Sequence, residues 1–263
     1  MKIDMFNRIL KANNALFLDD DYIIFNDYEL YSRKQDTSIP NKTLEELLEN
    51  KIGDKTIREL IEEKDEFYLQ ADMNGGRGSS SGSGKQMGFG NAPGRRGNDR
   101  EVLLNAELNL DQASGNSVES VLSRFKNKYG KSDREYAIAV DENGYVHQHI
   151  KGGKHSVGIS GDKGEIIIHN HPSGSNFSQA DLENVASTKA KGVIATSSNG
   201  TTKGTYTFIK TDKFKSKEFM KALNKARWDS SIGYNKGVSN WLRANQKTYG
   251  YTFSAKGVRN ANW

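Results

Sequence analysis

The sequence predicts a mixed α/β fold, of the α/β or α+β class. Short apolar segments typical of strands alternate with amphipathic segments of helical period through most of the chain. Turns rich in Asn, Asp and Gly separate these segments. The 263 residues are 35% hydrophobic and 27% charged, so we expect a soluble, cytoplasmic protein with one large domain or two smaller ones.

The composition excludes several classes of site and partner. Because the chain contains no cysteine, disulfides, thiolate metal sites and cysteine nucleophiles are excluded, and any metal must be held by His, Asp or Glu. The longest apolar runs, 15–18 and 166–168, are much shorter than the roughly 20 residues of a transmembrane helix. The first ten residues lack the apolar core of a secretory signal. We therefore expect no membrane partner.

Residues 1–74 are interpreted as a small acidic module. They carry 10 Lys or Arg against 17 Asp or Glu. Segments 22–25 and 28–31 predict a two-residue hairpin. A capping box at Thr43 predicts a short helix, and a second short helix follows Gly53. Since this core is too small to be very stable alone, we expect an adaptor or docking element.

Residues 75–100 form a sharp compositional break. This segment holds nine of the 26 glycines, several serines and only two large apolar residues. It cannot bury enough apolar surface to offset the entropy of ordering, which predicts a flexible linker. The remaining chain divides into a main domain, 101–212, and a basic, aromatic-rich helical extension, 213–263, that packs on it.

Helical and strand patterns alternate in the main domain and the extension. Asn116 is the expected cap of the first helix, and Gly130 is its expected end. The turns 141–144 and 199–200 each separate two strands. The expected elements are a helix over 117–125, strands over 135–140, 145–150 and 165–169, a helix over 181–190, strands over 193–196 and 205–209, and helices over 216–228 and 238–247.

Two histidines follow the apolar strand at 165–168. Side chains at positions i and i+2 of a strand point to the same face, so His169 and His171 can face one metal ion. Catalytic zinc takes three protein ligands and keeps a fourth position open for water. Asp181, ten residues after His171 and at the start of the next helix, is the third candidate ligand.

A zinc site of this kind also needs a base. The metal lowers the pKa of its water to about 7, and a nearby carboxylate takes the proton as the water attacks a carbonyl. Glu135 is the candidate base, with Glu165 and Glu142 as alternatives. The Ser178 hydroxyl is placed to stabilise an oxyanion. Ser178-x-x-Asp181 is also close to a capping box, and the two roles are compatible.

These residues together resemble the JAB1/MPN/Mov34 (JAMM) metalloprotease pattern, Glu…His-x-His-Pro…Ser-x-x-Asp. Here the pattern reads Glu135, then His169-Asn-His171-Pro-Ser-Gly174, then Ser178-x-x-Asp181. The string HNHPSG is most similar to the RadC-type bacterial branch, versions of which occur in phage head proteins and bacterial polymorphic toxins. The resemblance covers roughly residues 101–210. One departure is that six residues separate the second histidine from the serine, where the family has seven.

The resemblance implies a zinc-dependent peptidase or isopeptidase with a cytidine-deaminase-like α/β/α core. Its substrate would be a peptide or protein, such as a ubiquitin-like tail, a cell-wall peptide or a self-cleavage site in the linker. The N-terminal module would recruit that substrate, or a phage or host scaffold. The implied roles are Zn²⁺ ligands for His169, His171 and Asp181, base for Glu135, and oxyanion stabilisation for Ser178.

Two other functions stay open. Residues 75–263 carry 28 Lys or Arg against 16 Asp or Glu, a balance that suits nucleic acid, and the RadC branch is associated with DNA repair. The second alternative is a structural or toxin-associated protein with a degenerate JAB fold. We expect core packing, rather than stacking on bases, for the aromatic residues of the extension: Phe219, Trp228, Trp241, Tyr249 and Phe253.

The remaining histidines receive no chemical role from the sequence. His147 and His149 form a second His-x-His pair, but they lie in the middle of a predicted strand, where an exposed polar face explains them. His155 is expected to be a loop residue.

Overall fold

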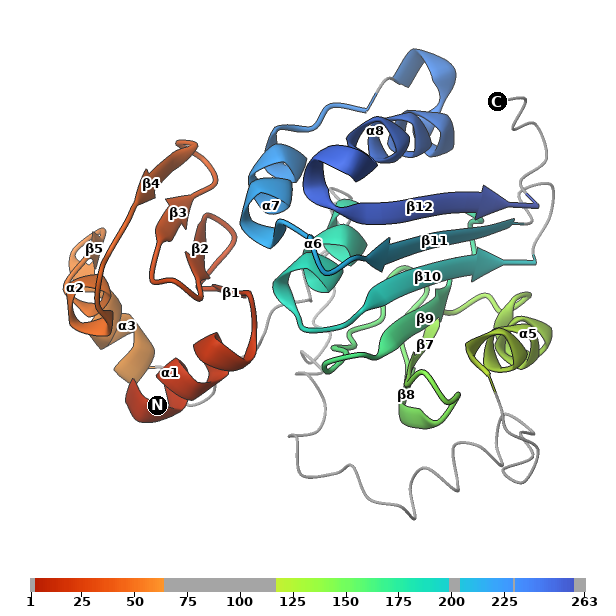
Figure 1. Ribbon diagram of the computed structural model, residues 1–263, viewed down its shortest axis with the longest axis horizontal. Coiled ribbons are helices and arrows are strands. Elements are labelled where there is room, and N and C mark those ends of the chain that lie inside the picture. Colours follow the sequence, from red (N-terminus) through yellow and green to blue (C-terminus); the bar gives the residue numbers. More distant parts are fainter. Residues whose placement is uncertain (1–2, 64–116, 199–203, 229, 258–263) are drawn as a thin grey trace.

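The computed structural model describes residues 3–63, 117–198, 204–228 and 230–257 (Figure 1). Its mixed α/β architecture confirms the predicted class. The predicted linker, 75–100, lies outside the described residues. Within the described ranges, no helix is both long and apolar enough to span a membrane.

The largest element of the fold is a six-stranded sheet in the order β12-β11-β10-β9-β7-β8. Strands β9 and β10 are parallel, and the other neighbouring pairs are antiparallel. Helix α6 lies between β9 and β10 in the chain, so the three elements form a βαβ unit. The strands are β7 (Tyr136–Val140), β8 (Val146–Lys151), β9 (Ile166–Asn170), β10 (Gly192–Ser197), β11 (Gly204–Lys210) and β12 (Tyr251–Lys256).

Helices cover both faces of this sheet. Helix α5 (Val118–Tyr129) buries Phe125 in one cluster with Ile138 and Ile168. A larger cluster on the other face joins the sheet to α6 (Gln179–Ser187), α7 (Ser216–Lys225) and α8 (Tyr234–Tyr249). Because the side chains of each strand alternate between these clusters, His169 shares the face of Ala137 and Ala195, its partners in β7 and β10.

The main-domain elements agree with those predicted, apart from small shifts of their ends. The cap of α5 is Ser117, whose hydroxyl accepts a 3.2 Å hydrogen bond from the Ser120 amide, and the helix ends at Gly130 as expected. Asn116, the predicted cap, lies outside the described residues, as does the turn 199–200. Helix α6 ends at Ser187, three residues before the predicted end.

The C-terminal extension is not wholly helical, which corrects one expectation. Strand β12 pairs antiparallel with β11 and forms one edge of the main sheet. The side chains at the start of β12 alternate between buried and exposed, and Tyr251 and Phe253 are the buried ones. This short strand is not predicted from the sequence, because a helical pattern runs up to Gly250. The expected core packing is confirmed: Phe219 and Phe253 are buried, and Trp228, Trp241 and Tyr249 pack against the same cluster.

Within residues 3–63, the N-terminal module contains a four-stranded antiparallel sheet, a two-stranded hairpin and three short helices. The predicted hairpin exists, but residues 26–29 form its turn, with Tyr28 at φ +70°. Thr43 and Thr56 cap the two short helices. The elements are α1 (Ile3–Ala12), β1 (Ala15–Phe17), β2 (Tyr22–Phe25), β3 (Leu30–Ser32), β4 (Thr37–Ile39), α2 (Leu44–Leu48), β5 (Lys51–Ile52), β6 (Lys55–Thr56) and α3 (Ile57–Glu62).

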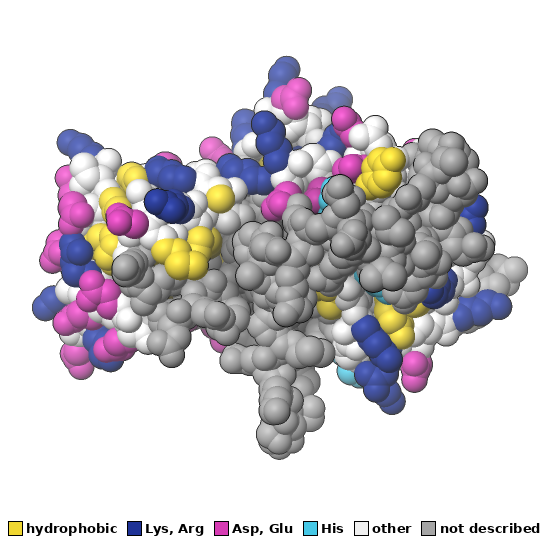
Figure 2. Space-filling model, turned by 90° about the horizontal axis from the view of Figure 1, so that it is seen from below, with side chains coloured by type: hydrophobic (Ala, Val, Ile, Leu, Met, Phe, Trp, Pro, Cys, Tyr) yellow, Lys and Arg dark blue, Asp and Glu magenta, His cyan; other side chains and the backbone are white. Residues whose placement is uncertain are grey.

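This module packs against α6 and α7 (Figure 1). Phe17 and Phe25 belong to the same buried cluster as Phe219 of α7. Arg33 forms a 2.8 Å ion pair with Glu183 of α6, across an interface where both side chains are largely buried. Figure 2 shows Asp and Glu side chains, interspersed with Lys and Arg, along the outer edge of the module at the left. One face of the module is therefore bound to its own chain, and its acidic edge faces solvent.

Candidate metal centre

The candidate site lies where β9 ends and α6 begins. His169 is the second-last residue of strand β9, and His171 directly follows the strand. The His171 amide donates a 2.9 Å hydrogen bond to the Thr196 carbonyl of β10, which holds the chain beside the sheet after the strand ends. In α/β folds, ligands bind at the carboxyl ends of parallel strands, close to the start of the following helix.

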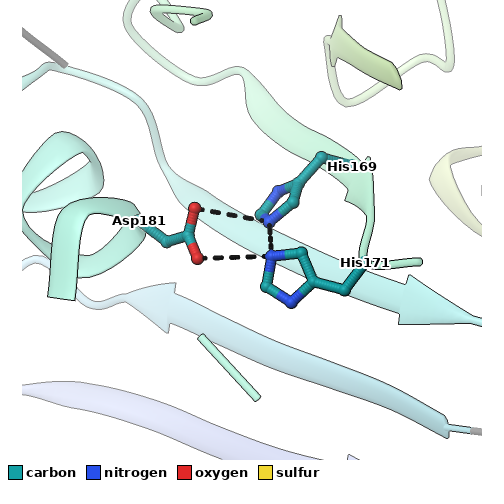
Figure 3. Close-up of side chains that lie close together, drawn as sticks. All are labelled: His169, His171 and Asp181. Atoms are coloured by element: carbon teal, nitrogen blue, oxygen red, sulfur yellow. Dashed lines mark hydrogen bonds and ion pairs between the residues drawn. The ribbon is translucent and has the colours of Figure 1, made fainter. Parts of the chain in front are cut away.

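Three side chains meet at this point (Figure 3). The Nε2 atoms of His169 and His171 are 2.8 Å apart, and each lies 3.4 Å from one carboxylate oxygen of Asp181. An ion with tetrahedral bonds of about 2.0–2.1 Å holds its ligands about 3.3 Å apart. The two separations from Asp181 match the edge of a zinc tetrahedron, and the two histidine nitrogens lie about 0.5 Å closer together than such an edge. The donor chemistry suits zinc. Both histidines are buried, with 3% and 5% of their surface exposed.

A contact of its other ring nitrogen, Nδ1, fixes the orientation of the His171 ring. Its Nδ1 lies 2.9 Å from the carbonyl oxygen of Ser175, which can only accept a hydrogen bond. The proton therefore belongs on Nδ1, and Nε2 directs its lone pair toward His169 and Asp181 when the ring is neutral. Metal-binding histidines are commonly oriented in this way by a backbone carbonyl.

The electrostatics of the three residues favour a cation. Burial alone would lower the pKa of His171, but hydrogen bonding to the Asp181 carboxylate and its charge raise that pKa to about 9. Burial would raise the pKa of Asp181, but the two histidines hold it well below its ordinary value. The Asp181 carboxylate thus stays ionised inside the protein, where it can balance a proton or a metal cation.

Ser178 holds the Asp181 carboxylate in place. The Ser178 hydroxyl accepts a 3.2 Å hydrogen bond from the Asp181 amide and donates a 2.8 Å hydrogen bond to Asp181 Oδ2. The Ser178 amide donates to the same oxygen at 2.7 Å. This capping box begins α6, and it leaves one carboxylate edge directed at the histidines. Because its proton points to Asp181, Ser178 is placed to orient a ligand, and its role at an oxyanion stays a prediction.

Glu135 lies beside the three candidate ligands, directly before β7. It is two residues from Ala137, the partner of His169 across the sheet, so its side chain shares the face of the histidines. Burial raises the pKa of Glu135, whereas the nearby His171 and His169 lower it and Asp181 raises it further. A raised carboxyl pKa suits a group that takes up a proton near neutral pH.

The two alternative bases lie at the other end of the sheet. Glu165 precedes β9, and its carboxylate accepts a 2.7 Å hydrogen bond from the Asp162 amide. Glu142 lies in the turn after β7, which runs antiparallel to β9. The lengths of β7 and β9 therefore separate both residues from the candidate ligands, and the structure leaves Glu135 as the one well-placed carboxylate of the three.

Helix α8 supports the loop between His171 and Ser178. Asn176 is fully buried in this loop, and its Nδ2 donates to the Asn235 carbonyl at 3.0 Å and to Ser239 Oγ at 2.9 Å. The Asn176 amide donates to Asn235 Oδ1 at 2.7 Å, and the Tyr234 hydroxyl donates to the Phe177 carbonyl at 2.9 Å. Sequence reasoning missed these residues because their partners lie about 60 positions away. The only local signal was an asparagine in a short loop.

The other histidines are placed away from the three candidate ligands. His149 is half-buried rather than exposed. It lies on the face of the sheet that α5 covers, and its Nε2 is 3.0 Å from the hydroxyl of Tyr129 in that helix. His147 lies 3.1 Å from the Asp141 carboxylate and is also half-buried. His155 is an exposed loop residue, as expected.

Comparison with protein-family models found no match for this chain. Comparisons with curated proteins and with solved structures found no match either. The evidence for function is therefore the motif and the geometry that the fold gives it.

Proposed function

We propose that this protein is a zinc-dependent metallopeptidase or isopeptidase of the JAMM type, similar to the RadC branch, with a cytidine-deaminase-like core. The observation that carries the proposal is the convergence of the His169, His171 and Asp181 donor atoms within 4.8 Å of one another, with Glu135 on the same face of the sheet. Among the described residues, this is the one His, Cys, Asp and Glu group with metal-binding spacing.

Each residue has a defined part in the proposed reaction. His169, His171 and Asp181 would hold Zn²⁺, which supplies a Lewis acid that acidifies water and polarises a carbonyl. Glu135 would take the proton of the attacking water and carry it to the leaving amine. Ser178 would keep the Asp181 carboxylate turned toward the histidines through its two hydrogen bonds to Oδ2.

The proposed substrate class combines this chemistry with the resemblance to the JAMM pattern. A zinc site with a carboxylate base can hydrolyse amides. The resemblance to the JAMM pattern selects a peptide or isopeptide bond as the proposed substrate, for example in a ubiquitin-like tail or a cell-wall peptide. The exposed acidic edge of the N-terminal module is the proposed contact for a phage or host scaffold, or for the substrate protein.

A cleavage assay tests the proposal. The zinc-loaded parent and the variants Glu135→Gln and Glu142→Gln are incubated with a peptide library, and new termini are identified by mass spectrometry. We expect Glu135→Gln to keep its zinc and to cleave about 10²-fold or more slowly, because it lacks the base. The matched Glu142→Gln variant should cleave like the parent. Equal cleavage by the parent and Glu135→Gln would refute the proposed base.

The two alternatives differ from this proposal in their need for metal. A DNA-associated protein or a phage structural protein with a degenerate JAB fold needs no bound zinc. Base stacking by the extension loses its support, because Phe219 and Phe253 are buried in the core.

A further inference from the structure

The side chain between the two histidines completes the edge of strand β7. Asn170 is fully buried, and its Oδ1 accepts a 2.7 Å hydrogen bond from the Tyr136 amide. Its Nδ2 donates a 2.8 Å hydrogen bond to the Arg134 carbonyl. One carboxamide therefore binds the backbone on both sides of Glu135. A carboxamide has the donor and acceptor of a peptide group, so it can replace a strand backbone in this pairing.

This pairing occurs where the two strands separate. The backbone ladder between β7 and β9 runs from Val140 and Ile166 to Ala137 and His169. Beyond His169 the chain stays paired with β10 only, through the Asn170–Thr196 pair and the hydrogen bond from the His171 amide to the Thr196 carbonyl. The Asn170 side chain bridges the distance that opens here, and the start of β7 remains attached to β9 without a backbone ladder.

The opposite edge of Glu135 is also fixed. The Glu135 amide donates to the Gly153 carbonyl at 2.8 Å, and the Glu135 carbonyl accepts from the Gly152 amide at 2.8 Å. With its backbone held on both edges, Glu135 keeps its side chain on the face of His169 and His171. Catalytic groups need this kind of support, because small displacements of a base slow proton transfer strongly.

We infer that Asn170 is a positioning residue for Glu135, whose backbone it holds at the distance from the histidines that the base requires. This inference rests on the proposed function. Aspartate at this position would keep the acceptor for the Tyr136 amide but would direct an oxygen at the Arg134 carbonyl. Threonine would be too short to bridge both groups. Each substitution should therefore release Glu135 and leave the three metal ligands in place.

Cobalt provides a test that does not depend on a substrate. Co²⁺ is added to the metal-free parent and to Asn170→Asp, Asn170→Thr, Glu135→Gln and the exposed-turn control Asn143→Ala, and visible spectra are recorded against pH. Loss of the Glu135 carboxylate beside the metal should displace the pH transition of the spectrum by on the order of 1 pH unit. We expect both Asn170 variants to bind one Co²⁺ and to shift in the same direction as Glu135→Gln. Asn143→Ala should not shift.

The outcomes separate this inference from the proposed function. If the cobalt spectrum of Asn170→Asp changes at the same pH as that of the parent, while the transition of Glu135→Gln is shifted, the positioning role is wrong and the base assignment stands. If the parent binds no Co²⁺, or the pH transition of the Glu135→Gln spectrum is not shifted, the proposed function fails and the inference fails with it. Hydrogen exchange in the unaltered protein gives an independent measurement. The Tyr136 amide should exchange at least roughly 100-fold more slowly than an open strand end, and fast exchange would overturn the inference.

Discussion

Ser239 of helix α8 accepts a 2.9 Å hydrogen bond from Asn176, in the loop that leads from His169 and His171 to α6. This contact joins the C-terminal extension to the candidate site. The loop is one residue shorter than in the JAMM pattern, and Asn176 anchors it with hydrogen bonds to α8. The neighbouring Ser175 carbonyl then faces Nδ1 of His171. The C-terminal extension thus helps to hold the loop that carries the candidate site.

Replacing Asn176 with alanine should weaken metal binding without removing a ligand. The loop would lose its contacts with Asn235 and Ser239, and the Ser175 carbonyl would no longer fix the His171 ring. Loss of such outer contacts typically costs 10–100-fold in metal affinity, so we expect about that effect. Competition with a chromogenic chelator measures it. The exposed neighbour of Ser239 gives a matched control, Asn240→Ala, which should bind metal like the parent. Equal affinity in both variants would contradict the role of the loop.

The ion pair between Arg33 and Glu183 should make the N-terminal module important for stability. Removing Arg33 leaves the Glu183 carboxylate buried without its ion-pair partner, although the 2.7 Å hydrogen bond from Gln179 remains. Such losses cost about 3–5 kcal/mol. Chemical denaturation of Arg33→Ala should show that loss in the free energy of unfolding.

The exposed ion pair of Lys55 and Glu63 provides the control for this experiment. Lys55→Ala should cost only about 0–1 kcal/mol, because both side chains are about half exposed. The double variant Arg33→Met/Glu183→Leu should recover most of the stability that Arg33→Ala loses, since it removes the unpaired charge. If Arg33→Ala costs no more than Lys55→Ala, the module is not held in the way the structure indicates.

Acid should loosen the same interface through Glu29. Burial would raise the pKa of Glu29, but hydrogen bonds from Lys217 and Lys221 outweigh it and lower that pKa to about 2. Because the pKa in the folded protein is below that of the unfolded chain, the stabilisation is present above about pH 4.5 and is lost as the pH falls toward 2.

Thermal melting at several pH values measures this contribution. Glu29→Gln should lower the melting temperature at pH 7 by the loss of on the order of 1 kcal/mol, about 2–4 °C for a chain of this size. At pH 3 the difference from the parent should shrink. The control, Asp54→Asn, replaces an exposed turn residue and should melt like the parent at both pH values. A difference that does not depend on pH would contradict the assigned role of Glu29.

Local signals in the sequence predicted much of the fold and identified the residues that meet at the candidate site. The His-x-His spacing on a strand, and the Ser-x-x-Asp capping box on the next helix, are short-range patterns with a definite geometry. The structure brings these residues together, so His169, His171 and Asp181 were accessible from spacing alone.

The features that sequence reasoning missed depend on contacts between distant segments. Strand β12 forms only because Tyr251 and Phe253 find a partner in β11, and no local pattern shows which edge of the sheet is open. The interface of the module with α6 and α7 likewise requires knowledge of which helix faces it. The role of Asn170 became visible once β7 was placed beside it, because its hydrogen bonds reach across 34 and 36 positions.

Metal content is the most direct test of the central claim, that His169, His171 and Asp181 form a zinc site. The parent, Asp181→Ala and the exposed-residue control Asp212→Ala are purified without added metal, reconstituted with Zn²⁺ and analysed by plasma mass spectrometry. We expect about one zinc per chain in the parent and in Asp212→Ala, and little zinc in Asp181→Ala. A parent that retains no zinc after reconstitution, or an Asp181→Ala variant that retains as much as the parent, would contradict the proposed metal centre.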